Sequence, residues 1–147
     1  MEDITKIVVP VDLEKHTKKV VDFAIYMGGK IDAHISLIHV TEFYSPGDMM
    51  LGSPSLETLN NERVQRAEET MNNLIEDSRK AYKKISGTVM KGEIVETIVR
   101  FAADEKAGLV IIGTHGAKGL EKILLGSVAE RVLKRVHCPT LTMNPYK

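Results

Sequence analysis

Short apolar runs alternate along the chain with longer segments in which apolar residues recur at helical spacing. The runs 6–12 and 109–112 are almost continuously apolar, which predicts strands buried on both faces. Residues 34–40 alternate imperfectly and predict another strand, and residues 85–90 predict a weaker, peripheral one. Residues 140–143 alternate between polar and apolar side chains, as expected of a strand at the edge of a sheet.

Four segments have the apolar spacing of amphipathic helices. The first runs from Leu13 to about Met27, and the pair Gly28-Gly29 is expected to end it. The third is expected to end at Gly108 by the same reasoning. The second spans about 54–78, and the fourth starts near 127 and is closed by Pro139. The predicted inner stripe of the last helix consists of Val128, Val132, Leu133 and Val136.

The order of these elements predicts one α/β domain over residues 1–147. Strand–helix alternation gives an open, mostly parallel, Rossmann-like sheet of five strands, with helices on both faces and right-handed crossovers. The two most uniformly apolar strands, the first and fourth, are expected at the centre, which gives the order 3-2-1-4-5. Ligands in such sheets bind at the carboxyl ends of the strands beside the switch point. Asp12 and Gly113 end the two central strands, so both are expected at that crevice.

Composition narrows the classes of function. The chain has 147 residues, 43% hydrophobic and 27% charged, as in an ordinary globular domain. Twenty basic residues balance twenty acidic ones, so no overall field favours nucleic acid or an anionic membrane. No apolar run approaches the ~20 residues that span a bilayer, and the first residues lack a signal-peptide pattern. The single cysteine, Cys138, fits a reducing interior, and we expect a cytoplasmic protein with no membrane or nucleic-acid partner.

Two segments leave their roles open. Residues 41–54 are rich in Gly and Pro, and the apolar residues 49–51 within them suit a lid or contact surface as well as a fold back onto the core. On the helix predicted over 54–78, the charged side chains are interpreted as a solvated face rather than a binding site. These charges include Glu62, Arg63, Arg66, Glu68 and Glu69.

The stretch 113–130 carries the clearest chemical signal. Gly113, Gly116 and Gly119 follow the fourth strand, and Gly126-Ser127 opens the last helix. Glycines let backbone N–H groups approach a ligand, and a helix N-terminus adds unpaired donors and a positive dipole end, so the pattern predicts a phosphate loop. A Walker A loop is excluded because no Lys-Ser/Thr pair follows the last glycine. The dinucleotide fingerprint is excluded because the glycine spacing and the preceding strand differ.

The spacing Gly113-x2-Gly116-x9-Gly126-Ser127 resembles the nucleotide-binding motif of the universal stress protein family. The similarity includes residues 7–12, 92–98 and 124–130 and Cys138-Pro139, and so spans nearly the whole chain. It implies a domain that binds ATP, or ADP or AMP, with any Mg²⁺ held mainly by the phosphates, and homodimers joined through the last strand. The implied adenine and ribose contacts are Pro10, Val11, Asp12 and Val40. The implied phosphate contacts are Gly113, His115, Gly116, Gly126, Ser127, Val128 and Ala129.

Several of these residues have a structural alternative. Ser127 and Glu130 fit a capping box, in which each side chain accepts from the backbone N–H of the other residue. Asp12 suits either a cap on the following helix or an acceptor for a ribose hydroxyl or the adenine amino group. Many relatives follow this aspartate with Gly-Ser, where this chain has Leu13-Glu14. We therefore expect a narrower ribose end and an added negative charge near the phosphates.

Three functions fit the sequence. The leading hypothesis is an ATP-binding stress-response or regulatory protein whose nucleotide occupancy alters its shape or its protein partners. The second is a slow or partner-dependent ATP hydrolase or phosphotransferase. Around the loop, however, only Glu121 and Glu130 carry carboxylates, so we expect no catalytic residue and no metal site formed by the protein. The third is a nucleotide-free dimeric scaffold.

Overall fold

Five parallel strands form one sheet in the computed structural model, which describes residues 2–42, 56–115 and 126–146. The strand order is β3-β2-β1-β4-β5, as the sequence predicts. The strands are β1 (Lys6–Pro10), β2 (His34–Thr41), β3 (Ile85–Lys91), β4 (Leu109–Gly113) and β5 (Thr140–Met143). The helices are α1 (Thr17–Ile31), α2 (Leu56–Ser78), α3 (Ile94–Asp104) and α4 (Ser127–Arg135).

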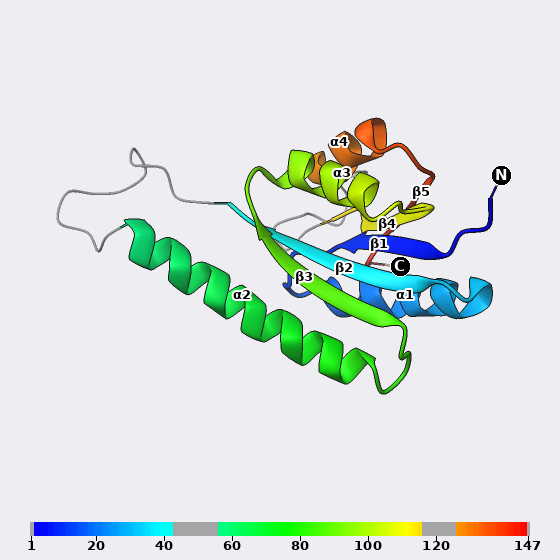
Figure 1. Cartoon of the computed structure of the whole chain (residues 1–147), viewed down its shortest axis with the longest axis horizontal. Coiled ribbons are helices and arrows are strands. Elements are labelled where there is room, and N and C mark those ends of the chain that lie inside the picture. Colours follow the sequence, from blue (N-terminus) through cyan, green and yellow to red (C-terminus); the bar gives the residue numbers. More distant parts are fainter. Residues whose placement is uncertain (1, 43–55, 116–125, 147) are drawn as a thin grey trace.

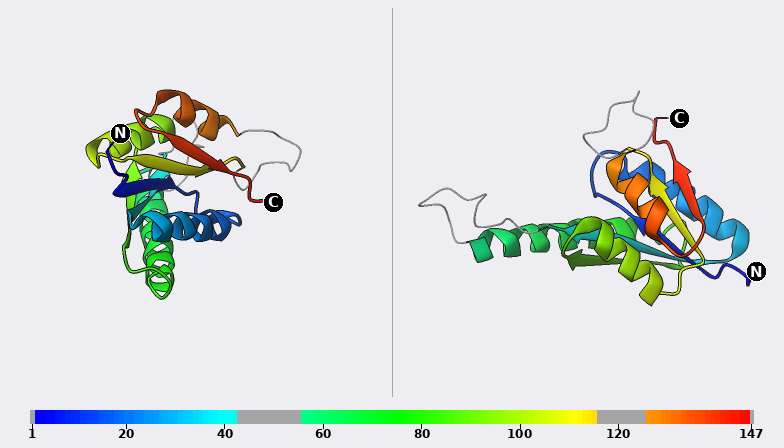
Figure 2. Two further views of the ribbon diagram at one scale, coloured as in Figure 1. Left: turned by 90° about the vertical axis from the view of Figure 1, so that its right-hand side faces the viewer. Right: turned by 90° about the horizontal axis from the view of Figure 1, so that it is seen from above.

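Two apolar layers hold the helices on opposite faces of the sheet (Figures 1 and 2). Successive residues of a strand point to opposite faces, so Ile7 and Val9 of β1 pack with α1 and α2, whereas Val8 packs with α3 and α4. All three side chains are fully buried. This double burial explains why the central strands are continuously apolar rather than alternating.

The ends of two helices differ from the predicted ones. Helix α1 runs through Gly28-Gly29 to Ile31, and Asp32 ends it in the left-handed region with φ 56°. Gly28 serves packing instead, because a Cβ there would lie 2.9 Å from Ile35 Cδ1 on β2. Helix α3 ends at Asp104, before the predicted stop at Gly108, and Lys106 supplies the left-handed residue of the turn.

The two edge strands agree with the prediction, but the inner stripe of α4 is partly wrong. Strands β3 and β5 occupy the two edges of the sheet. On α4, Ala129 and Val132 are buried, whereas Leu133 is 42% exposed. The described part of the 41–54 connection is limited to Thr41, which ends β2, and Glu42; residues 43–54 lie outside the described structure. Within the described residues, no helix is long and apolar enough to cross a membrane.

Candidate nucleotide site

A cavity of 740 Å³ opens at the carboxyl ends of β1, β2 and β4, where α1 and α4 begin. Its size is in the usual range for small-molecule sites. All predicted site residues that the structure describes line it, and Gly116 lies outside the described residues. These lining residues are Pro10, Val11, Asp12, Val40, Gly113, His115, Gly126, Ser127, Val128 and Ala129. The cavity therefore lies at the predicted switch point between β1 and β4.

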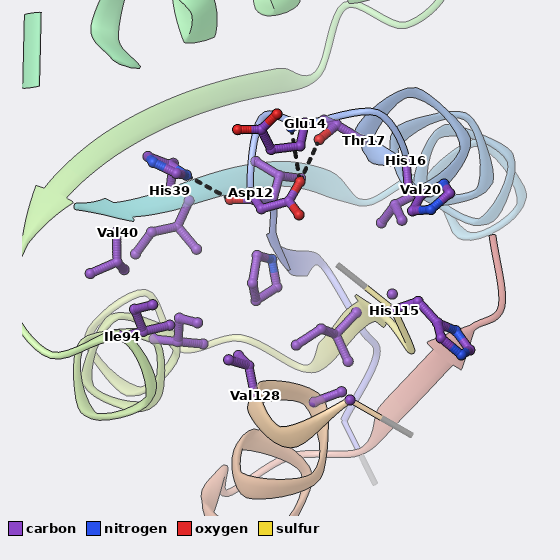
Figure 3. A pocket seen from close by; sticks show the side chains of 18 of the residues that line it. Asp12, Glu14, His16, Thr17, Val20, His39, Val40, Ile94, His115 and Val128 are labelled. Carbon is purple, nitrogen blue, oxygen red and sulfur yellow. Dashed lines mark hydrogen bonds between the residues drawn. The ribbon is translucent and has the colours of Figure 1, made fainter. Parts of the chain in front are cut away.

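The two ends of the cavity differ in chemistry. In Figure 3, Val40 of β2 and Ile94 of α3 lie at one end, while His16 and His115 lie at the other. Asp12 stands above the space between them. One end thus includes an apolar wall suited to a flat ring system, and the other carries the two labelled histidines.

The loop after β1 is fixed by its own hydrogen bonds. The Val11 N–H donates to the Ile38 carbonyl at 2.9 Å, and His39 Nδ1 lies 2.9 Å from the Val11 carbonyl oxygen. Asp12 Oδ1 accepts from the Glu14 N–H at 2.9 Å and from the Thr17 hydroxyl at 3.1 Å. Asp12 therefore stabilises the entry to α1, which is close to the capping alternative, while its exposed carboxylate still lines the cavity.

The residues that replace Gly-Ser after this aspartate behave differently from each other. Leu13 has a φ of 63°, in the left-handed region that glycine adopts most easily. Its side chain packs against the core cluster on the α1 face, and the described lining of the main cavity does not include it. Leu13 instead lines a smaller cavity that also includes Asp12, and the predicted narrowing of the ribose end stays a prediction. Glu14 does line the cavity and adds its negative charge there.

Helix α4 begins with Ser127, and Gly126 is its N-cap. The Gly126 N–H donates to the Thr114 carbonyl at 2.6 Å, and the Gly126 carbonyl accepts from the Glu130 N–H at 2.9 Å. The predicted capping box is wrong, because its serine is the first helical residue and Gly126 stands at the cap. The Glu130 carboxylate instead pairs with Lys134 at 3.0 Å. The first-turn N–H groups of Ser127 and its two successors have no acceptor within the helix, so they present a donor cluster to the cavity.

Gly126 is a glycine because two segments approach closely there. A Cβ at this position would lie 2.8 Å from the Thr114 carbonyl oxygen, which is closer than real Cβ contacts. The hydrogen bond between these residues ties the start of α4 to the end of β4. The glycine thus positions the helix N-terminus at the switch point.

His115 forms part of the polar wall. It is 5% exposed, and its Nδ1 lies 2.7 Å from the Thr114 hydroxyl. Its ring meets the Tyr146 ring edge-on, with 5.1 Å between centroids. Figure 3 shows the ring directed toward β5. The Nδ1 atom is therefore engaged within the protein.

Twelve of the described lining residues were not predicted as site residues, and three of them, His16, Glu42 and Arg63, add polar or charged groups at the two ends. The ring of His16, the N-cap residue of α1, meets the Tyr146 ring edge-on with 4.8 Å between centroids, and its Nε2 is buried without a hydrogen-bond partner in the described part of the chain. Burial, followed by the charge of Lys15, lowers the His16 pKa. Glu42 and Arg63 line the opposite end. Arg63 comes from α2, which the sequence links to the cavity by no motif, and its half-buried side chain lines the cavity, whereas the sequence predicts a solvated face there.

The described residues form no group of three His, Cys, Asp or Glu side chains that could hold a metal ion. The site as described therefore consists of an apolar wall, a carboxylate-bearing loop, three histidines, the charged residues Glu42 and Arg63, and a helix N-terminus.

Comparison with known proteins agrees with the sequence motif. The family model described as "Universal stress protein family" matches residues 3–143. The chain belongs to the universal stress protein family. Universal stress protein MJ0531 of Methanocaldococcus jannaschii is 34% identical over 142 residues, which cover 97% of this chain and 83% of that protein. The family resemblance seen in the sequence is thereby confirmed.

Solved structures of universal stress proteins share the fold. Universal stress protein UspA from Lactobacillus plantarum superimposes with a TM-score of 0.82 at 17% identity, covering 98% of this chain and 100% of that one. A universal stress protein in complex with cAMP matches with a TM-score of 0.70 at 20% identity, over 98% and 99% of the two chains. The universal stress protein from Archaeoglobus fulgidus in complex with dAMP matches at 0.69 and 22% identity, over 96% and 98%.

Proposed function

We propose that this universal stress protein binds an adenine nucleotide, with ATP as its working ligand, and acts as a regulator through nucleotide occupancy and homodimerisation. The observation that carries the proposal is the opening of the α4 N-terminus and the carboxyl ends of β1 and β4 onto one cavity of 740 Å³. Family membership and the cAMP and dAMP complexes of two structural neighbours support the same ligand class. We place this activity in the cytoplasm.

The proposed orientation follows from the chemistry of the two ends. The base lies against the apolar wall that includes Val40 and Ile94, with the Val40 backbone at the end of β2 beside it. The ribose lies near Asp12, whose carboxylate accepts from hydroxyl groups. The phosphates lie at the start of α4, where backbone N–H groups and the helix dipole favour an anion. Any Mg²⁺ is held mainly by the phosphates.

Ser127 gives the sharpest test of this orientation. In Ser127→Asp, a carboxylate at the first helical position is compatible with the helix dipole, so the fold is expected to persist. The same carboxylate repels the phosphates, and we expect ATP affinity to fall by about tenfold or more. Isothermal titration calorimetry measures the affinities for ATP and for adenosine. The adenosine affinity is expected to stay unchanged, which would show that the fold and the nucleoside contacts persist.

Ser127→Asn is the matched control, since it has nearly the same shape without the charge. It is expected to retain ATP binding. Wild-type protein that carries no co-purified nucleotide and does not bind ATP at millimolar concentration would contradict the proposal. Phosphate release followed over hours on the same samples separates a binding protein from a slow hydrolase.

A further inference from the structure

A second, smaller cavity adjoins the main one on the side where α2 lies. It measures 280 Å³ and shares four lining residues with the main cavity: Asp12, Glu14, His39 and Arg63. Its described lining includes no residue of β4 or α4. The shared wall therefore lies on the β1, β2 and α2 side, away from the helix N-terminus proposed for the phosphates.

Arg63 is held at this wall by a backbone contact. Its guanidinium Nη1 donates a hydrogen bond to the carbonyl oxygen of Glu42, the residue that follows β2. The Arg63 side chain is half-buried. Figure 1 shows α2 extending along the outside of β2 and β3 toward the end where β2 finishes. The helix thus brings a fixed guanidinium to the carboxyl end of β2, beside the Val40 wall.

The charges at this end argue against a phosphate partner for Arg63. Among the described residues that line the main cavity, the carboxylates are those of Asp12, Glu14 and Glu42, and Arg63 is the guanidinium; three histidines, His16, His39 and His115, also line it. One guanidinium therefore stands among three carboxylates, so a phosphate placed there would meet more repulsion than attraction. A neutral nucleoside, with hydroxyl and amino groups that donate to carboxylates, is compatible with the same surroundings.

We infer that Arg63 contacts the nucleoside half of the bound nucleotide, with its planar guanidinium against the face of the base. The inference rests on the proposed function and adds a residue that determines affinity for the base. A guanidinium stacks on aromatic faces and is more weakly hydrated than an ammonium, so it suits this position better than lysine. The base then lies between the guanidinium and the apolar wall, whose Val40 and Ile94 are labelled in Figure 3.

The test compares ligands that share the nucleoside and differ in phosphate number. Dissociation constants for adenosine, AMP and ATP are measured by calorimetry for the wild type, Arg63→Met and Arg63→Lys. We expect Arg63→Met to weaken all three ligands by the same factor, about tenfold. Arg63→Lys keeps the charge and the aliphatic stem but loses the planar group. It is therefore also expected to lower the affinities for adenosine, AMP and ATP by one common factor.

Arg66→Met is the matched control. Arg66 lies one turn further along α2, is exposed, and lines only the smaller cavity. It is expected to leave all three constants unchanged. A loss that grows from adenosine to ATP would assign Arg63 to the phosphates, and unchanged constants would remove it from the site; either result overturns the inference. Wild-type protein that binds none of the ligands would instead reject the proposed function itself.

Discussion

At the residue scale, His16 shows how the cavity shapes the chemistry of its wall. Burial is the first cause that lowers its pKa below the ordinary value of 6.5, followed by Lys15; Lys19 and His115 act in the same direction and Asp12 opposes them. The unpartnered Nε2 agrees with a neutral ring. Because the unfolded chain then binds the proton more tightly than the folded one, His16 protonation favours unfolding.

The resulting prediction concerns stability as the solution is acidified. The contribution of His16 is complete above its ordinary pKa and is lost as the pH falls through that value toward the lower folded pKa. We expect thermal midpoints measured between about pH 8 and pH 5 to fall with pH, and His16→Gln to reduce the slope. The pKa of His34 is also lowered, first by burial and then by Lys6, so its protonation favours unfolding as well. His34→Gln is therefore expected to reduce the slope of the thermal midpoint with pH further. A His16→Gln slope equal to that of the wild type would contradict this account.

Residue roles are predictable from sequence where a strand end or a helix start dictates them. Asp12 lies just past β1, Gly113 is the last residue of β4, and Gly126-Ser127 opens α4, so their meeting follows from topology. Arg63 and His16 carry no such signal, because α2 is long and charged on several faces and His16 is a single polar residue before a helix. Their approach to the cavity depends on how the helices pack, which local patterns do not specify.

At the element scale, packing rather than local conformation decides where several glycines stand. The sequence pattern predicts that Gly28 ends α1, yet this glycine lies within the helix and gives close approach to Ile35. The alternation of apolar runs is sufficient to predict the strand order, since it reflects burial over a whole element. Helix ends depend on single residues such as Asp32, which adopts a left-handed conformation in place of a glycine. A non-glycine residue in this conformation does not alter the hydrophobic periodicity, so the sequence pattern does not reveal it.

Gly87 of β3 and Gly29 of α1 provide a matched test of this argument. A Cβ at Gly87 would lie 2.5 Å from Met71 Sδ and 2.9 Å from Ile75 Cγ1, both on α2. We expect Gly87→Ala to lower the free energy of unfolding by about 1–3 kcal/mol through overpacking. A Cβ at Gly29 would meet no neighbouring atom of the described residues within 4 Å. Gly29→Ala is therefore expected to raise stability by roughly 0.5–1 kcal/mol through helix propensity.

Urea denaturation of both variants measures these changes. Equal effects of the two substitutions would show that Gly87 does not bring α2 into close contact with β3. Because α2 also carries Arg63, a shift of the helix in Gly87→Ala is expected to weaken the binding of adenosine and of ATP by the same factor.

At the scale of the whole molecule, the cavity and the sheet edge are joined by the C-terminal segment. The Thr114 N–H donates to the Met143 carbonyl at 2.9 Å, where β5 ends, and Lys19 Nζ donates to the Pro145 carbonyl at 2.8 Å. The Tyr146 ring then contacts both His16 and His115 of the cavity wall. We therefore expect the proposed nucleotide, where it moves either histidine, to act on a segment continuous with β5 and so on the sheet edge.

The same edge gives the prediction for assembly. Strand β5 lies at one side of the sheet, and its Leu141 is 36% exposed. An open strand edge with an apolar side chain favours pairing with a second copy, so we expect a homodimer in light scattering. Leu141→Lys places a charge on this edge and is expected to give a monomer. Leu133→Lys, on the similarly exposed Leu133 of α4, is the control and is expected to remain dimeric.

If ATP occupancy acts through the Tyr146 segment, ATP is expected to shift the dimer dissociation constant of the wild type. Tyr146→Ala is then expected to abolish that shift while the protein still binds ATP. A wild-type monomer, or a dimer that persists in Leu141→Lys, would place the interface elsewhere.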